Sequence, residues 1–103
     1  MKNWSVYLIR TQHSTLYTGI ATDVLQRFTE HQSGKRGAKY LRAKGPLTLV
    51  YHVEVGTHSL AAKVEYKIKQ LVKAKKENIV ANTPSRESLL RCLNISENIS
   101  ENI

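Results

Sequence analysis

Two tyrosines, an arginine and a histidine fall within the first third of the chain at spacings that would let them act together. Tyr7 and Tyr17 are ten residues apart, and Arg27 and His31 are four residues apart. A tyrosine hydroxyl has a reference pKa of about 10, so it is a weak base at neutral pH unless a neighbour polarises it. An imidazole could polarise it, and a guanidinium fork fits the oxygens of a phosphate. The alternative for two strand tyrosines is packing in the core.

The stretch that holds these residues is predicted to be a β-hairpin followed by a helix. Residues Ser5–Arg10 are rich in β-branched and aromatic side chains, which favours a strand, and a second short strand is expected at Leu16–Ile20. Thr22-Asp23 then offers an N-cap. The apolar positions that follow recur at helical spacing: Val24, Leu25 and Phe28. The tyrosines would lie across the hairpin from each other, and the arginine and histidine one turn apart on the helix.

A third strand is predicted at Leu47–Val55, the densest run of β-branched and aromatic residues. His52 and Glu54 would share one face of it, because strand side chains alternate. They could form a metal pair, but a polar stripe that faces solvent is the simpler interpretation, and we favour it.

A long helix is predicted to begin at residues 57–59 and to reach about Lys75. Its apolar stripe comprises Leu60, Ala61, Val64, Ile68, Leu71 and Val72. Glu65 lies on the border of this stripe, where a carboxylate must be paired, hydrogen-bonded or metal-bound to avoid a desolvation cost of several kcal/mol. Three partners are open: a metal ion, Lys69 one turn further along, or Arg27.

Positive charge is concentrated in the first 80 residues. The net charge is +8, and residues 1–80 hold 14 Lys and Arg against 5 Asp and Glu. Five cations fall in residues 32–46, here named the basic loop: Lys35, Arg36, Lys39, Arg42 and Lys44. Such an excess favours a polyanion such as a nucleic-acid backbone, although it can also serve solubility alone. Tyr40 in this loop could stack on a base or pack against the domain.

Length and composition indicate one small domain. A chain of 103 residues supports one modest core. No apolar run approaches the roughly 18 residues that a membrane span needs, and the first ten residues lack the apolar core of a signal peptide. The single Cys92 excludes an internal disulfide and a cysteine-based zinc site. We expect a soluble, cytoplasmic protein that is a monomer.

The order of these features resembles the GIY-YIG nuclease superfamily, in particular its small stand-alone bacterial members. The resemblance covers about residues 4–80 and rests on VYLIR, LYTGI and R-x-x-x-H, followed by a basic loop and a helix that carries Glu65. The first motif is degenerate, since Ser5-Val6 stands where Gly-Ile would be. The second differs only by Thr18 in place of Ile.

The resemblance implies a role for each tyrosine. It makes Tyr7 the general base and Tyr17 its partner in positioning water or substrate, although the residue types alone do not rank the two. On chemical grounds, His31 or a metal-bound water could polarise the base.

The resemblance also implies how the phosphate would be held. Arg27 would neutralise a phosphate oxygen, and Glu65 would bind the cation, Mg²⁺ or Mn²⁺, because such an ion often binds through one carboxylate and keeps several waters. Gly19 completes the second motif. A site asparagine is expected at Asn78, with Asn82 as the alternative.

The expected fold class is α/β (α+β), a small three-stranded antiparallel sheet flanked by helices. Residues 1–82 are predicted to form the GIY-YIG-like nuclease domain. Residues 83–103 are predicted to add a short helix, started by Thr83-Pro84, and a low-complexity tail that is frayed or disordered. The helix would present three residues on one side: Leu89, Leu90 and Leu93.

The leading interpretation is a divalent-metal-dependent endonuclease that hydrolyses phosphodiester bonds in DNA, with DNA repair or recombination as its expected setting. A nucleic-acid-binding module that keeps the scaffold without turnover is the rival, because the first motif is degenerate. A structural or protein-interaction role ranks third, since it leaves the basic loop unexplained.

Binding to DNA should weaken steeply as salt rises if the basic loop contacts phosphates. The logarithm of the binding constant is expected to fall with the logarithm of salt concentration by about 0.9 for each phosphate neutralised on duplex DNA. Replacing Lys35, Arg36 and Lys39 with alanine should flatten this slope, measured by fluorescence anisotropy. An unchanged slope would place the contact surface elsewhere.

Overall fold

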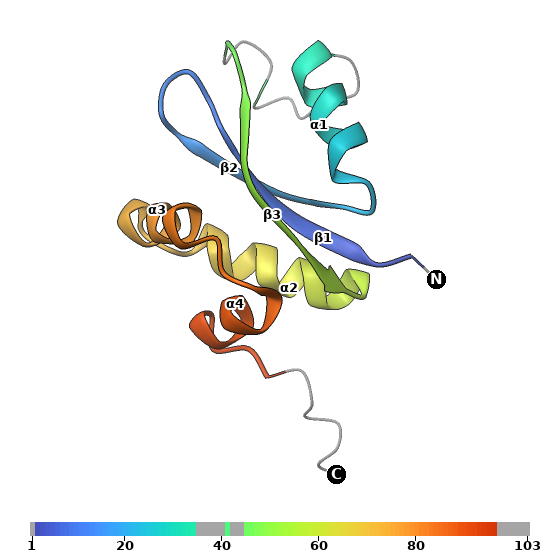
Figure 1. Ribbon diagram of the computed structural model, residues 1–103, viewed down its shortest axis with the longest axis vertical. Helices are drawn as coiled ribbons and strands as arrows, with labels where there is room; N and C mark the ends of the chain where they lie inside the picture. Colours follow the sequence, from blue (N-terminus) through green and yellow to red (C-terminus); the bar gives the residue numbers. More distant parts are fainter. Residues whose placement is uncertain (1, 35–40, 42–44, 97–103) are drawn as a thin grey trace.

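A three-stranded antiparallel sheet forms the middle layer of the fold, in the strand order β2-β1-β3 (Figure 1). The computed structural model describes residues 2–34, 41 and 45–96. Its strands are β1 (Trp4–Arg10), β2 (Leu16–Ala21) and β3 (Thr48–Gly56). The predicted hairpin, third strand and fold class are therefore confirmed.

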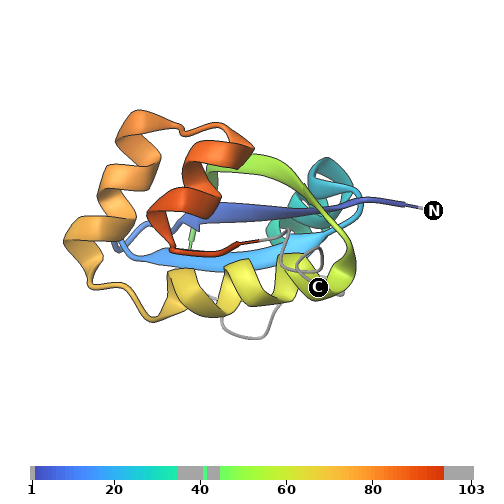
Figure 2. The same cartoon turned by 90° about the horizontal axis from the view of Figure 1, so that it is seen from below.

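Helices cover both faces of this sheet (Figure 1). On one face lies α1 (Val24–Ser33). The other face carries α2 (His58–Lys69), α3 (Lys73–Asn82) and α4 (Arg86–Cys92). Figure 2 shows α2 on the side of β2, whereas α3 and α4 lie on the side of β3. The molecule is thus a three-layer sandwich in which β2 and β3 are the edge strands of the sheet.

Alternation along β1 divides the interior into two cores. Val6 and Leu8 point toward α2, α3 and α4, whereas Tyr7 and Ile9 point toward α1, and all four side chains are at most 2% exposed. The larger core also includes Tyr51, Val55, Ala61, Val64, Ile68, Ile79, Leu89, Leu90, Leu93 and Ile95. The smaller core adds Ala21, Val24, Leu41 and Leu47. The central strand is therefore buried on both sides.

The first helix begins where the sequence predicts. The Asp23 side chain accepts a hydrogen bond from the backbone N–H of Gln26 at 3.1 Å, which caps the helix, and Gly34 ends it with a positive φ of 81°. One detail was wrong: Leu25, expected on the apolar face, is 66% exposed.

The long helix predicted for residues 57 to about 75 was also wrong, because the chain turns between Lys69 and Lys73. The Gln70 N–H closes α2 by bonding to the carbonyl groups of Lys67 and Ile68, and Val72 is extended with ψ of 160°. Val72, expected in the apolar stripe, is consequently 65% exposed. Neither glycine nor proline lies between residues 57 and 82, so the break has no local signal.

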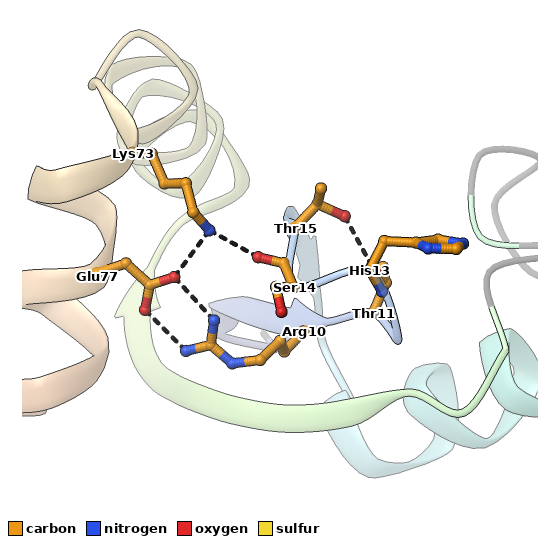
Figure 3. A network of polar contacts seen from close by, with 7 residues as sticks. All are labelled: Arg10, Thr11, His13, Ser14, Thr15, Lys73 and Glu77. Carbon is orange, nitrogen blue, oxygen red and sulfur yellow. Dashed lines mark hydrogen bonds and ion pairs between the residues drawn. The ribbon is translucent and has the colours of Figure 1, made fainter.

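A polar cluster explains where α3 goes after the break. Arg10, at the end of β1, donates two hydrogen bonds to the Glu77 carboxylate at 2.7 and 2.8 Å (Figure 3). The Lys73 ammonium pairs with the same carboxylate at 3.1 Å and donates to the Ser14 carbonyl oxygen at 2.6 Å. The first turns of α3 are thereby fixed to the β1–β2 hairpin, and one continuous helix could not make these contacts.

The last helix begins two residues later than expected. Ser85, not Thr83-Pro84, caps α4 by accepting a hydrogen bond from the Ser88 N–H at 3.2 Å. Its leucines are buried as predicted, at 0 to 5% exposure. They join the same core as β1, so this helix is part of the packed structure, while a functional boundary at residue 82 stays a prediction.

Two sets of predictions lie outside the described residues. They concern the basic loop, with Lys35, Arg36, Lys39, Tyr40, Arg42 and Lys44, and the tail after residue 96. Leu41, within the loop, is described and is buried in the smaller core. Across the described residues, every helix is too short or too polar to cross a bilayer.

Glu77→Gln should lower the melting temperature at neutral pH. Hydrogen bonds from Arg10 and Lys73 hold the pKa of Glu77 down at about 2, below its ordinary 4.5. A depressed carboxyl pKa stabilises the fold above the unfolded pKa, and this stabilisation is lost as pH falls toward the folded value. The difference in stability between wild type and variant should therefore shrink as pH falls from 4.5 toward 2. Urea unfolding at a series of pH values measures it.

Glu87→Gln is the matched control, because Glu87 also pairs with an arginine but is 68% exposed. Equal effects of the two variants would show that the cluster does not anchor α3.

Candidate active site at the edge strand

The phenol of Tyr7 lies directly across the backbone of Gly19. The two residues are Cα partners in the β1–β2 ladder. A Cβ atom on Gly19 would lie 2.5 Å from Cζ of Tyr7 and closer still to its hydroxyl oxygen. Glycine is therefore required here because any side chain would displace the phenol. The structure gives Gly19, predicted as a motif residue, a steric function.

The first helix places His31 on the other side of this phenol. The Tyr7 hydroxyl and Nε2 of His31 are 2.8 Å apart in a buried hydrogen bond, and the imidazole is only 3% exposed. Tyr17, two residues before Gly19 on the same face of β2, is half-buried, and its ring lies 5.6 Å from the imidazole and 6.4 Å from the Tyr7 ring. Three predicted residues are therefore in mutual contact range.

Burial controls the protonation of this pair. Desolvation, with Tyr17 adding to it, raises the pKa of Tyr7 to about 12, although the nearby Arg27 guanidinium opposes the shift. Desolvation and the charge of Arg27 lower the pKa of His31. At neutral pH the histidine is therefore uncharged and the tyrosine protonated. In this state the tyrosine hydroxyl can donate its hydrogen bond to Nε2 of the uncharged imidazole.

Arg27 lies one turn before His31, on the same face of α1, and bridges two partners. Its Nη1 is 2.8 Å from Oε1 of Glu30, and hydrogen bonding to that carboxylate raises the pKa of Arg27. The guanidinium also hydrogen-bonds to Tyr7, which favours the ionised phenol. Glu30 was missed by the sequence analysis, yet its position three residues after Arg27 is a recognisable helix pairing.

Glu65 approaches the phenol from the other helical layer. It lies on α2, with a side chain 23% exposed, and pairs with Lys69 at 3.2 Å, one of the partners that the sequence left open. Its negative charge is among the influences that raise the pKa of Tyr7, after burial and Tyr17. The Tyr7 hydroxyl at the β2 edge therefore contacts residues of α1 and also feels the charge of a residue on the opposite face of the sheet.

The remaining candidates lie elsewhere. His52 and Glu54 are both exposed on β3, where Glu54 accepts a hydrogen bond from Asn3 at 2.6 Å. No cluster of three or more potential metal-ligating side chains occurs within the described part of the chain. Asn78 and Asn82 line a pocket of about 410 Å³ between α3 and α4, whose lining includes none of the tyrosines, Arg27 or Glu65. The structure does not bring the asparagines to the Tyr7 site.

Two tyrosines, an arginine and a histidine thus meet at the edge of a β-hairpin, and comparison with known families identifies the class of protein that carries them. Residues 3–78 match the GIY-YIG catalytic domain. The chain belongs to the GIY-YIG nuclease family.

Relatives narrow this assignment to the small stand-alone branch. The UPF0213 protein YhbQ of Salmonella arizonae is 54% identical over 93 residues, covering 90% of this chain and 92% of the relative. A UPF0213 protein of Klebsiella pneumoniae is 56% identical over 87 residues, covering 84% and 81%. The solution NMR structure of a UPF0213 protein from Bacillus halodurans has a TM-score of 0.52 at 34% identity, and covers 91% of this chain and 99% of its own.

Gly19→Ala should destabilise the protein by about 1–3 kcal/mol, because the new methyl group overpacks against Tyr7. Tyr7→Leu removes the obstructing atoms, so the alanine should cost much less in that background. Urea unfolding of the four proteins of this cycle measures the coupling.

Gly34→Ala serves as the control, since its methyl group meets nothing within 4 Å and only the positive φ is strained. Its cost should be about 1–2 kcal/mol with or without Tyr7→Leu. If Gly19→Ala destabilised the protein equally with and without Tyr7→Leu, the close contact between Gly19 and Tyr7 would be disproved.

Proposed function

We propose that this protein is an endonuclease that hydrolyses phosphodiester bonds in DNA with the help of a divalent cation. The observation that carries the proposal is the buried hydrogen bond between Tyr7 and His31, 2.8 Å long and beside Arg27, in a member of a nuclease family. A tyrosine hydroxyl that is hydrogen-bonded to an uncharged imidazole can transfer its proton. Core packing alone does not require such a hydrogen bond.

Tyr7 acts as the base in this proposal. Its pKa near 12 means that the free phenol is almost wholly protonated at neutral pH. It therefore needs to pass its own proton to Nε2 of His31 while it takes a proton from the attacking water. Arg27 assists because its hydrogen bond favours the ionised phenol. Tyr17, next to both rings, positions the water or the substrate.

Arg27 neutralises the phosphate. Its guanidinium can donate to phosphate oxygens in a fork, and charge that grows on those oxygens strengthens the contact in the transition state. The pair with Glu30 fixes the direction of the guanidinium before the substrate arrives. Glu30 is thus a positioning residue for Arg27.

Glu65 fits the role of metal ligand. It is a hard oxygen donor, partly accessible to solvent, on the helix nearest the β2 edge, and its charge reaches the Tyr7 hydroxyl. Mg²⁺ or Mn²⁺ is suited to a site with one carboxylate, because these ions retain water. When bound, the cation stabilises charge on the phosphate and on the leaving oxygen. Lys69 must release the carboxylate for this to happen.

The degenerate first motif does not argue against catalysis. Val6, which replaces the family isoleucine, is fully buried on the face of β1 opposite Tyr7. Thr18 in the second motif is likewise buried, on the face of β2 opposite Tyr17 and Gly19. These two departures support packing and leave the tyrosine hydroxyls in place. The third, Ser5, is half-buried in β1 and pairs with Ala21 and Glu54 in the sheet. This favours the enzyme over the rival, a binding module without turnover. Repair and recombination of DNA both use such a cut, and we propose that setting, in the cytoplasm.

Glu65→Gln should abolish Mg²⁺- or Mn²⁺-dependent cleavage and leave DNA affinity level or higher, because it removes the charge that holds a cation near the phosphate backbone. Cleavage is measured on duplex, single-stranded, flapped and branched DNA, and affinity by anisotropy. Stability should change by no more than about 0.5 kcal/mol, since the pair with Lys69 is half-exposed.

Glu87→Gln, on the far helix α4, is expected to cleave like wild type. Cleavage that survives in Glu65→Gln would remove Glu65 from the site. Tight DNA binding by wild type without cleavage of any substrate would favour the binding module.

A further inference from the structure

A pocket of about 270 Å³ opens beside Arg27. The end of the sheet contributes Trp4 from β1 and Ile20 from β2, and α1 contributes Asp23, Gln26, Arg27 and Glu30. The pocket therefore spans the β2 edge, with an apolar side on the sheet and a polar side on the helix. Arg27, the proposed phosphate ligand, belongs both to this pocket and to the Tyr7 site.

Trp4, which is half-buried, is the aromatic residue on the apolar side. The Trp4 indole meets His58 with ring centroids 4.6 Å apart and an interplanar angle of 83°. A perpendicular contact of this kind uses at most one face of the indole. Ile20 beside it is half-buried. Nucleobases are planar and stack well on an aromatic side chain, and such stacking depends little on which base it is.

The polar side discriminates between a base and a phosphate. Asp23 and Glu30 both carry negative charge at this wall, which disfavours a second phosphate in the pocket. Gln26 offers an amide with donors and an acceptor, the groups that recognise base edges. It is exposed on α1. Its backbone N–H serves the Asp23 cap, and its Nε2 donates to Oε2 of Glu30 at 3.5 Å, a long bond that a base edge can replace.

The volume of the pocket is close to that of a single base. At about 30 Å³ for each water, the pocket holds the equivalent of about nine waters, and a nucleobase has about ten non-hydrogen atoms. A base that stacks on Trp4 and meets Gln26 within the pocket is turned away from a complementary strand, so the nucleotide that uses the pocket is unpaired.

We propose that this pocket binds the unpaired base of the nucleotide next to the phosphate held by Arg27, with Trp4 as the stacking surface and Gln26 on the base edge. The inference rests on the proposed function, and it adds a substrate class: DNA with unpaired nucleotides at the cut, such as single strands, flaps or branches, in preference to continuous duplex.

The protein carries its own probe, because Trp4 is the single tryptophan of the chain. Fluorescence excited selectively in tryptophan reports this pocket alone. The full-length protein with Ca²⁺ in place of Mg²⁺ is titrated with a short single strand, the matching duplex, and an abasic strand of equal length and charge. The single strand should quench the fluorescence, while the duplex and the abasic strand should change it much less at equal saturation, judged by anisotropy.

Variants separate recognition from folding. Gln26→Leu should weaken binding of the single strand about 2- to 10-fold, the effect of one hydrogen bond, and leave duplex binding unchanged. Gln32→Leu, exposed on the same helix outside the pocket, is the matched control. Trp4→Leu should weaken single-strand binding about 5- to 150-fold by loss of stacking. Because Trp4 also packs against the larger core, its melting temperature is measured alongside.

The outcomes distinguish this inference from the function it rests on. Equal quenching by the abasic strand, or saturated single-strand binding without quenching, would overturn the base pocket while cleavage remained intact. A base-dependent signal that Gln26→Leu weakens would support the pocket, even if no DNA were cut and the proposed function failed. Absence of binding to every oligonucleotide would overturn both.

Discussion

The candidate site depends on one close contact, the phenol of Tyr7 lying across the backbone of Gly19. A strand tyrosine normally ends above its neighbour's side chain, and here there is none, so the hydroxyl extends toward the edge of the sheet. Only from that position can it meet His31 from α1 and sense Glu65 from α2. The glycine therefore matters less for its backbone freedom than for the space that it leaves. The other residues of the candidate site lie around the Tyr7 hydroxyl, which occupies this space.

The burial that positions Tyr7 also suppresses its reactivity. A phenol with a pKa near 12 is further from a useful base than free tyrosine. The same desolvation keeps His31 uncharged and able to receive a proton. In the proposed mechanism, proton transfer therefore depends on the pair, together with Arg27, and not on either residue alone. This arrangement would hold the free protein inert and would favour proton transfer once a phosphate and a cation supply the missing charge.

The sequence predicted those features of the fold that depend on residues close together in the chain. The hairpin, the Asp23 cap and the turn-related pair Arg27 and His31 all follow from neighbours within a few residues. The break between α2 and α3 could not be predicted, because no glycine or proline marks it and the contact that fixes α3, from Arg10 to Glu77, joins residues 67 positions apart. The apolar residues keep their helical spacing across the break, so the sequence pattern predicted one continuous helix. The role of Glu30 was missed for a different reason: charged pairs on helix surfaces are common and rarely functional.

The chemistry and the packing of this fold end at different places along the chain. The last residue near the Tyr7 hydroxyl is Glu65, but the core beneath β1 closes only with Leu89 and Leu93 of α4. Hydrogen bonds from Tyr51 to the Pro84 carbonyl and from Arg86 to the Val55 carbonyl fasten that closure to β3. A catalytic segment cut after α2 would expose the apolar underside of the sheet. The smallest portable unit that keeps the packed core is therefore the chain through Ile95, which is about half as long again as the 65 residues that end at Glu65.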